Sequence, residues 1–232
     1  MLRKDKRSML LSLVMGDGCL HYHKRDKKTY GGLTIAHSCV YADYIAWKAN
    51  LIGSILGREI KLRKTSNSRF SESSNDLIQI AASWKRFKAW RKFIYPKGKK
   101  DKSKILKFIT NPDFLLAVWI LDDGYVEGKI DPKYQKCYNA NLRLFICDQT
   151  DEQCFIIQKW IYDKFGFDTK LKYQKSNEKK YPFLKINSKD SLTLWDKIRN
   201  FVLQFKSMHY KFRYLEMRYQ YKKSIAQSTQ LE

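Results

Sequence analysis

The sequence predicts an α+β protein made of two similar halves, and three observations support this. Two apolar helical runs, LLSLVMGDG at 10–18 and LAVWILDDG at 116–124, each end in an aspartate followed by glycine. After each run the chain has the patterns of two strands, a helix, two strands and a helix. A glycine ends the second helix of each half, Gly57 in one and Gly166 in the other. We therefore expect an αββαββα unit used twice, with one antiparallel sheet in each half.

The elements of the first half follow from side-chain periodicity and from turn residues. Apolar Leu33 and Ile35 alternate with Thr34 and Ala36, which indicates a strand with one buried face. The elements expected in this half are the helical run 10–18, a strand pair over 21–38 that turns at 30–32, a helix at 42–56, strands at 59–65 and 76–82 separated by a polar turn, and a helix at 84–95.

The second half repeats this order. Leu142, Leu144 and Ile146 alternate with polar and aromatic neighbours, as expected of a strand with one buried face. Its further elements are helices at 151–165 and 192–205 and strands at 168–174 and 183–187. A basic stretch with proline and glycine separates the halves, so we predict half-domains at 1–95 and 112–232 joined by a linker at 96–111.

Composition indicates a polyanionic partner. The formal net charge is +23, from 46 Lys and Arg against 23 Asp and Glu, and the basic residues are spread along the chain. No apolar run approaches the roughly 20 residues needed to cross a bilayer, so nucleic acid is favoured over a membrane. The five cysteines form no metal-ligand pairs and resemble the reduced thiols of an intracellular protein, and the sequence does not start like a secreted one.

Strand alternation leaves one basic face on the sheet of each half. Lys170 and Lys172, for example, share a face opposite Leu171. A two-stranded ribbon fits the major groove of DNA, where Arg, Lys, Gln and Asn read base edges. An ordinary solvated face is the alternative, but its repetition in both halves favours contact with DNA. The residues predicted to contact DNA are Thr34, Lys61, Arg63, Gln79, Arg143, Lys170, Lys172 and Lys185.

The two Asp-Gly runs resemble the motifs of the LAGLIDADG homing endonucleases, of the monomeric two-motif type. Ser12 and Gly16 occupy the small positions of the first motif, whereas the second has Val118 and Asp122 where small residues are usual. The resemblance covers most of the chain. It implies that the motif helices pack side by side at the centre, related by a pseudo-twofold axis. The two sheets would then form a DNA-binding saddle.

The resemblance also implies the catalytic site. Asp17 and Asp123 would be the catalytic acids and metal ligands, with Gly16 and Asp122 as further ligands, and the alternative for Asp122 is an interface residue or an outer-shell acid. An acid at a helix C-terminus opposes the helix dipole at a cost of about 0.3–1 kcal/mol, so finding it twice favours a functional role. Carboxylates suit Mg²⁺, and about two or three ions would be shared between the halves, with Mn²⁺ or Ca²⁺ able to substitute in binding.

The family usually places one basic residue of each half near the scissile phosphates. In the second half, KSMHYK at 206–211 resembles the signature that carries this lysine, so Lys211 is the candidate. In the first half the lysine would lie within 97–104, with Lys100 as first choice and Lys102 as the alternative. Such a lysine stabilises negative charge or polarises water, although a solvated helix lysine is the structural alternative for Lys211.

The resemblance implies a monomeric, Mg²⁺-dependent, site-specific endonuclease that cuts both strands of DNA. It would recognise an asymmetric target of roughly 20 bp, leave short 3′ overhangs and promote intron or intein mobility. It would act in a bacterial or phage cytoplasm or in an organelle. The alternative is an RNA maturase that binds its host group I intron and assists splicing. A regulator on the same scaffold would be expected to lack one acid. Because both acids are present, nuclease function is preferred.

Overall fold

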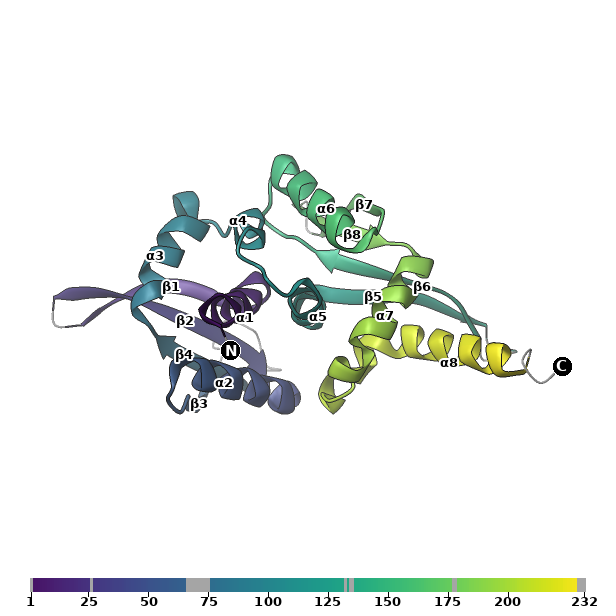
Figure 1. The fold of residues 1–232 in the computed structure, drawn as a ribbon, viewed down its shortest axis with the longest axis horizontal. Helices are drawn as coiled ribbons and strands as arrows, with labels where there is room; N and C mark the ends of the chain where they lie inside the picture. Colours follow the sequence, from purple (N-terminus) through teal and green to yellow (C-terminus); the bar gives the residue numbers. More distant parts are fainter. Residues whose placement is uncertain are drawn as a thin grey trace. The chain divides into compact units, whose positions relative to one another are not determined.

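A computed structural model describes residues 2–25, 27–65, 76–131, 133, 136–176 and 179–228. The chain forms two compact units, Met1–Val118 with Phe205–Ser207, and Trp119–Gln204 with Met208–Glu232. Each unit contains a four-stranded antiparallel sheet, so the α+β class predicted from the sequence is confirmed (Figure 1). Among the described helices, none is both long and apolar enough to cross a membrane.

The first unit has the strand order β1-β2-β4-β3. Its sheet consists of β1 (Cys19–Arg25), β2 (Lys28–Ser38), β3 (Leu62–Thr65) and β4 (Leu77–Ser83). The helical elements are α1 (Arg3–Met15), η1 (Cys39–Tyr41), α2 (Ala42–Leu56), α3 (Lys85–Ile94), η2 (Pro96–Gly98) and α4 (Lys102–Leu106). The helix α5 (Pro112–Asp123) begins in this unit and ends in the second.

The second unit has the equivalent strand order, β5-β6-β8-β7. Its sheet consists of β5 (Gly124–Asp131), β6 (Lys136–Phe145), β7 (Thr169–Ser176) and β8 (Lys179–Ile186). The helical elements are α6 (Asp151–Phe165), α7 (Ser188–Val202), η3 (Lys206–Phe212) and α8 (Arg213–Ser228). The order helix, two strands, helix, two strands, helix is therefore present twice, as predicted.

In each unit the helices pack on one face of the sheet. In the first, α2 and α3 contact the strands whose buried side chains include Leu33 and Ile35. In the second, α7 and α8 contact β6, where Leu142 and Leu144 are buried. Strand side chains alternate between faces, so the core of each unit lies between helices and sheet, and the opposite sheet face carries the polar residues.

The position of the first hairpin turn differs from the prediction. Gly31 and Gly32 lie inside β2, and the chain reverses between Arg25 and Lys28 instead. A Cβ on Gly31 would overlap the backbone of α3, and one on Gly32 would lie 2.5 Å from the ring of His21. These glycines thus permit close packing, a requirement that the sequence pattern does not distinguish from a turn.

Several boundaries also differ. The third strand begins at Leu62, so Lys61 directly precedes it. The last predicted helix of the second half begins at Ser188, because the Asn187 side chain caps it by accepting from two backbone N–H groups. The helices α4 and α8 were not predicted. The polar turn expected between β3 and β4 falls on 66–75, outside the described residues.

Candidate nuclease site

Asp17 lies in the turn that joins α1 to β1. The Gly18 N–H donates to the carbonyl of Leu13 at 2.9 Å, which closes the helix with one residue more than a regular α-turn. A Cβ on Gly18 would lie 2.5 Å from that carbonyl oxygen, so the tight exit from helix to strand requires glycine. The helix therefore presents Asp17 immediately beyond its C-terminus, where its side chain is 32% exposed.

The second motif ends differently. Asp122 and Asp123 both belong to the last turn of α5, and Gly124 opens β5. A Cβ on Gly124 would overlap the carbonyl of Ile120, four positions earlier, whereas the corresponding contact of Gly18 is five positions earlier. The Trp119 indole N–H donates to Oδ2 of Asp123 at 3.1 Å, which orients that carboxylate within its own helix.

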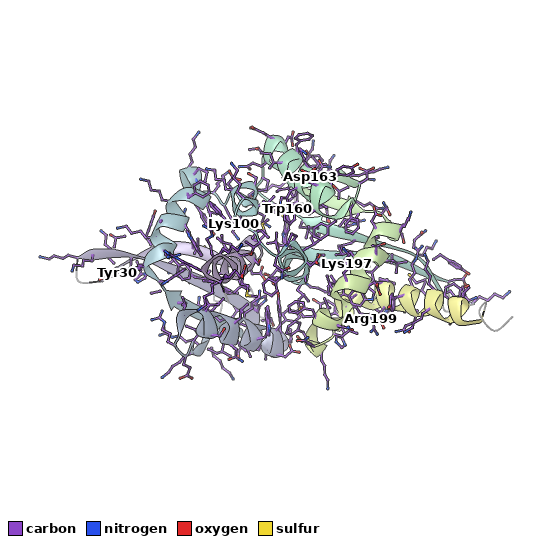
Figure 2. All side chains as sticks on the ribbon, in the orientation of Figure 1. Tyr30, Lys100, Trp160, Asp163, Lys197 and Arg199 are labelled. Carbon is purple, nitrogen blue, oxygen red and sulfur yellow. The ribbon has the colours of Figure 1, made fainter. Side chains whose placement is uncertain are left out.

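A lysine reaches the end of the motif helix in each unit. In the first, Lys100 Nζ donates to the carbonyls of Val14 and Gly16 at 2.8 and 2.7 Å (Figure 2). In the second, Lys211 Nζ donates to the carbonyls of Leu121 and Asp122 at 2.6 and 3.1 Å. Each second acceptor directly precedes a predicted catalytic aspartate. The contacts satisfy terminal carbonyl groups and bring a positive charge to the helix end that carries the acids.

The alternative lysine of the first half occupies a different environment. Lys102 is buried at the start of α4. The preceding Asp101 caps this helix by accepting from the backbone N–H of Ser103. The carbonyl groups of α1 are reached by Lys100, the first choice, whose counterpart by contact is Lys211.

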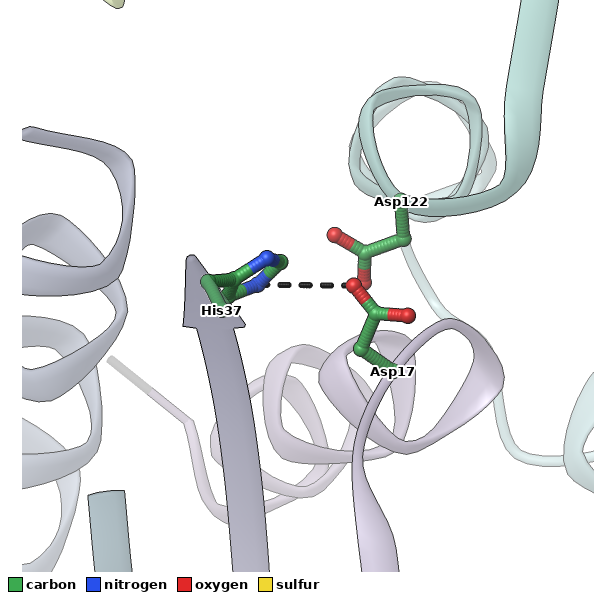
Figure 3. Close-up of side chains that lie close together, drawn as sticks. All are labelled: Asp17, His37 and Asp122. Atoms are coloured by element: carbon green, nitrogen blue, oxygen red, sulfur yellow. Dashed lines mark ion pairs between the residues drawn. The ribbon is translucent and has the colours of Figure 1, made fainter. Parts of the chain in front are cut away.

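Asp17 has a buried basic pair beside it. His37, near the end of β2, places Nε2 at 3.4 Å from Oδ2 of Asp17 (Figure 3). Lys48 of α2 places Nζ at 2.9 Å from the same His37 nitrogen. Lys48 has no exposed surface and His37 is 9% exposed, so a charged side chain is buried close to a predicted metal ligand.

The basic face of the second sheet contains three predicted DNA contacts in one row. Arg143 of β6 pairs with Lys185 of β8, which pairs with Lys170 of β7. Glu127 of β5 accepts from Arg143 at 2.6 Å and lies 3.5 Å from Lys185. The hydrogen-bonded Arg143 guanidinium holds the pKa of Glu127 below its usual value. Without DNA, Glu127 therefore offsets part of the positive charge of Arg143 and Lys185.

The first sheet has a less basic version of this face. Arg63 pairs with Gln79, which pairs with Ala36 of β2. Thr34 lies on the same face, two residues from Ala36, and its hydroxyl is 3.3 Å from His21 Nδ1. Lys172 of the second unit, the remaining predicted DNA contact, is exposed and pairs with Phe183. The sheets bring the predicted residues of each unit to one face, and their contact with DNA stays a prediction.

Sequence reasoning missed His37, Lys48 and Glu127. A signal for Lys48 was present, because it lies in the apolar stripe of α2 with Tyr44 and Ile52. His37 follows the buried alternation of Leu33 and Ile35, so its polarity at a core position was also visible. For Glu127 the sequence has no such signal, because it occupies the polar face of its strand.

The chain matches the family model described as LAGLIDADG DNA endonuclease family over residues 7–194. Its fold is similar to that of the homing endonuclease I-WcaI bound to its DNA recognition sequence, with a TM-score of 0.67, 19% identity, and coverage of 91% of this chain and 87% of that one. A structure of mesophilic variants from the homing endonuclease I-DmoI gives a TM-score of 0.52 at 14% identity, covering 85% and 96% of the two chains. At these identities the similarity concerns the fold.

Curated relatives include protein RecA of Mycobacterium gastri, 25% identical over 177 residues, and protein RecA of Mycolicibacterium flavescens, 22% identical over 174 residues. Each alignment covers 74% of this chain, and the chain spans 39% and 38% of the length of these relatives. The family model, in contrast, covers most of the chain and includes both motifs and both sheets. The chain therefore belongs to the LAGLIDADG DNA endonuclease family.

Proposed function

We propose that the chain is a site-specific endonuclease that uses Mg²⁺ to hydrolyse both strands of a DNA target. The observation that carries this proposal is the repeated arrangement at the motif helices. In each unit acidic residues lie at the C-terminus of a helix or directly beyond it, and a lysine donates to the carbonyls beside them. Within a family of DNA endonucleases, acids and lysines placed together twice are suited to cleavage at two phosphates.

The acids fit a hard divalent cation. Asp17, Asp122 and Asp123 offer carboxylate oxygens, and the Gly16 carbonyl adds an oxygen of the same chemistry, as Mg²⁺ requires. Bound Mg²⁺ would supply a more acidic water and charge neutralisation at the phosphate, with Mn²⁺ or Ca²⁺ as substitutes in binding. The Trp119 indole N–H keeps the Asp123 carboxylate oriented.

The lysines would act on developing charge. Lys100 and Lys211 are each anchored by two carbonyl oxygens, which fixes the ammonium group without neutralising it. A fixed ammonium beside a scissile phosphate stabilises the negative charge that develops there, or polarises a water.

The basic sheet faces would bind the DNA. The half-domains at 1–95 and 112–232, joined by 96–111, would each contact part of one asymmetric target of roughly 20 bp, because the two faces differ in sequence. Cutting would leave short 3′ overhangs and promote intron or intein mobility inside the cell. The residues assigned to this surface are Thr34, Lys61, Arg63, Gln79, Arg143, Lys170, Lys172 and Lys185.

The test uses the purified chain with Mg²⁺ and DNA that carries the uninterrupted host gene. We expect a double-strand cut that is abolished in Asp17→Asn and reduced in separate Asp122→Asn and Asp123→Asn variants. The matched control is Asp163→Asn, an exposed acid of α6 that pairs with Lys159. Tight binding to intron RNA without cutting at any insertion site would contradict the proposal and favour the maturase.

A further inference from the structure

The two units differ at one buried place, which in the first unit lies beside the end of the motif helix. In the first unit Lys48 and His37 are packed in the core, with Lys48 Nζ also 4.4 Å from the centre of the Tyr44 ring. Burying an ammonium group is unfavourable, because its partners replace water only in part. Apolar side chains of similar size would give the core at least as much stability as this pair does.

The second unit shows which residues the fold accepts at this place. Helices α2 and α6 have the same length and end at left-handed glycines, Gly57 with φ of 69° and Gly166 with φ of 70°. Ile157 occupies the position of Lys48 relative to these glycines.

His37 has a counterpart by the same comparison. Ile146 lies at the same spacing before α6 as His37 does before α2. Ile146 and Ile157 are both fully buried. The duplicated fold therefore accommodates two isoleucines where the first unit has a basic pair.

The direction of the contacts indicates the role of the pair. The His37 Nε2 that lies 2.9 Å from Lys48 also lies 3.4 Å from Oδ2 of Asp17. A residue that only completed the core would have no reason to approach a carboxylate at the end of the motif helix. Groups that contact metal ligands from outside orient them and tune the site.

We propose that Lys48 and His37 are positioning residues that orient the Asp17 carboxylate for metal binding, a role that rests on the proposed function of Asp17 as a ligand. Lys48 donates to Nε2 of His37, and this buried pair places a positive charge and the edge of the imidazole against the Asp17 carboxylate. In the second unit Ile146 and Ile157 occupy the equivalent places, so these positions support Asp17 but offer no such contact to the acids of the second unit.

The decisive variant copies the second unit into the first. We expect His37→Ile with Lys48→Ile to fold, with a melting temperature equal to or above that of the wild type, because isoleucines occupy the equivalent places in the second unit. We expect Mn²⁺ binding, measured from the electron paramagnetic resonance signal of the free ion, to weaken about tenfold. Cleavage in Mg²⁺ falls about 10- to 100-fold, while DNA affinity in Ca²⁺ is unchanged.

Two further variants separate positioning from charge and folding. His37→Gln offers a carbonyl oxygen to Lys48 and an amide N–H to Asp17, so it keeps most of the Mn²⁺ affinity and cleavage rate. Lys88→Met removes an exposed lysine of α3 and serves as the control for lost charge; it leaves both readouts unchanged.

Three results have distinct meanings. Wild-type Mn²⁺ affinity and cleavage in the double isoleucine variant would overturn the positioning role. Failure of this variant to fold would also overturn it, because the pair would then be structural. A wild-type protein whose Mn²⁺ binding depends on Asp17, but which cuts no DNA, contradicts the nuclease proposal, while the Mn²⁺ comparison still decides the role of the pair.

Discussion

Glu216 of α8 connects this helix to α7, and the segment that carries Lys211 lies between the two helices in the chain. Its carboxylate accepts from the indole N–H of Trp195 at 2.9 Å and from two guanidinium nitrogens of Arg199 at 2.8 and 2.6 Å. Phe212, which directly follows Lys211, stacks on Trp195 at 5.1 Å between ring centroids. The change Glu216→Gln keeps the size of this side chain and removes its charge, so it weakens the connection between α7 and α8.

The pKa of Glu216 sets the magnitude of this effect. The hydrogen-bonded Arg199 guanidinium is the main cause that lowers the pKa from 4.5 to about 2. This fall corresponds to about 3 kcal/mol at 1.36 kcal/mol per pKa unit. Solvent screening at a side chain that is 28% exposed reduces it to about 2 kcal/mol. Because the folded-state pKa is the lower one, the stabilisation is complete above pH 4.5 and is lost as the pH falls toward 2.

Urea unfolding followed by circular dichroism measures this difference. At pH 7 we expect Glu216→Gln to be less stable than the wild type by about 2 kcal/mol. The gap narrows below pH 4.5, where the wild type binds a proton on unfolding. Glu59→Gln, at an exposed position between α2 and β3, is the matched control and leaves the stability unchanged. Equal stability of the wild type and Glu216→Gln at pH 7 would refute the role of the charge. A difference in their free energies of unfolding that stays constant down to pH 2 would also refute it.

Three further predictions concern the two lysines at the motif helices, the packing of Gly31 against α3, and the basic face of the second sheet. Lys100→Met and Lys211→Met each lower the cleavage rate about 100-fold with unchanged DNA binding in Ca²⁺, measured by single-turnover cleavage and fluorescence anisotropy. Gly31→Ala lowers the free energy of unfolding by about 2 kcal/mol, because its methyl group would overlap the α3 backbone; thermal unfolding measures the loss, and an unchanged melting temperature would contradict it. Glu127→Gln releases its two basic partners and tightens DNA binding severalfold at low salt, so unchanged affinity would show that this acid does not compete with phosphates.

Much of the fold could be predicted because periodicity depends on local chain geometry. Apolar residues at helical and strand spacing identified the repeated elements, and glycines such as Gly57 and Gly166 identified where helices end. The hairpin turn was wrong because Gly31 has a tertiary role. Its missing side chain admits the backbone of α3, a segment far along the chain. A sequence pattern alone does not separate a glycine needed for a turn from one needed for packing.

The candidate site divides in the same way. The aspartates and Lys211 were chosen because they belong to short motifs, and Lys100 was chosen from a lysine-rich run in which register was uncertain. In the structure Lys100 donates to the carbonyls of Val14 and Gly16, whereas Lys102 is buried at the start of α4. The pair beside Asp17 depends on β2 and α2 coming together, a contact between elements that sequence reasoning treated separately.

The internal duplication makes the chain its own comparison. Where both units have the same arrangement, as with the lysines on the helix-end carbonyls, either the fold or the chemistry could require it. Where equivalent positions of the two units hold different residues, the fold tolerates either residue. A residue that is costly to bury at such a position therefore needs a reason other than the fold. Lys48 is such a residue, because Ile157 fills the equivalent position with no buried charge. The reason must then lie in its neighbours, and the chain of contacts from Lys48 leads through His37 to Asp17.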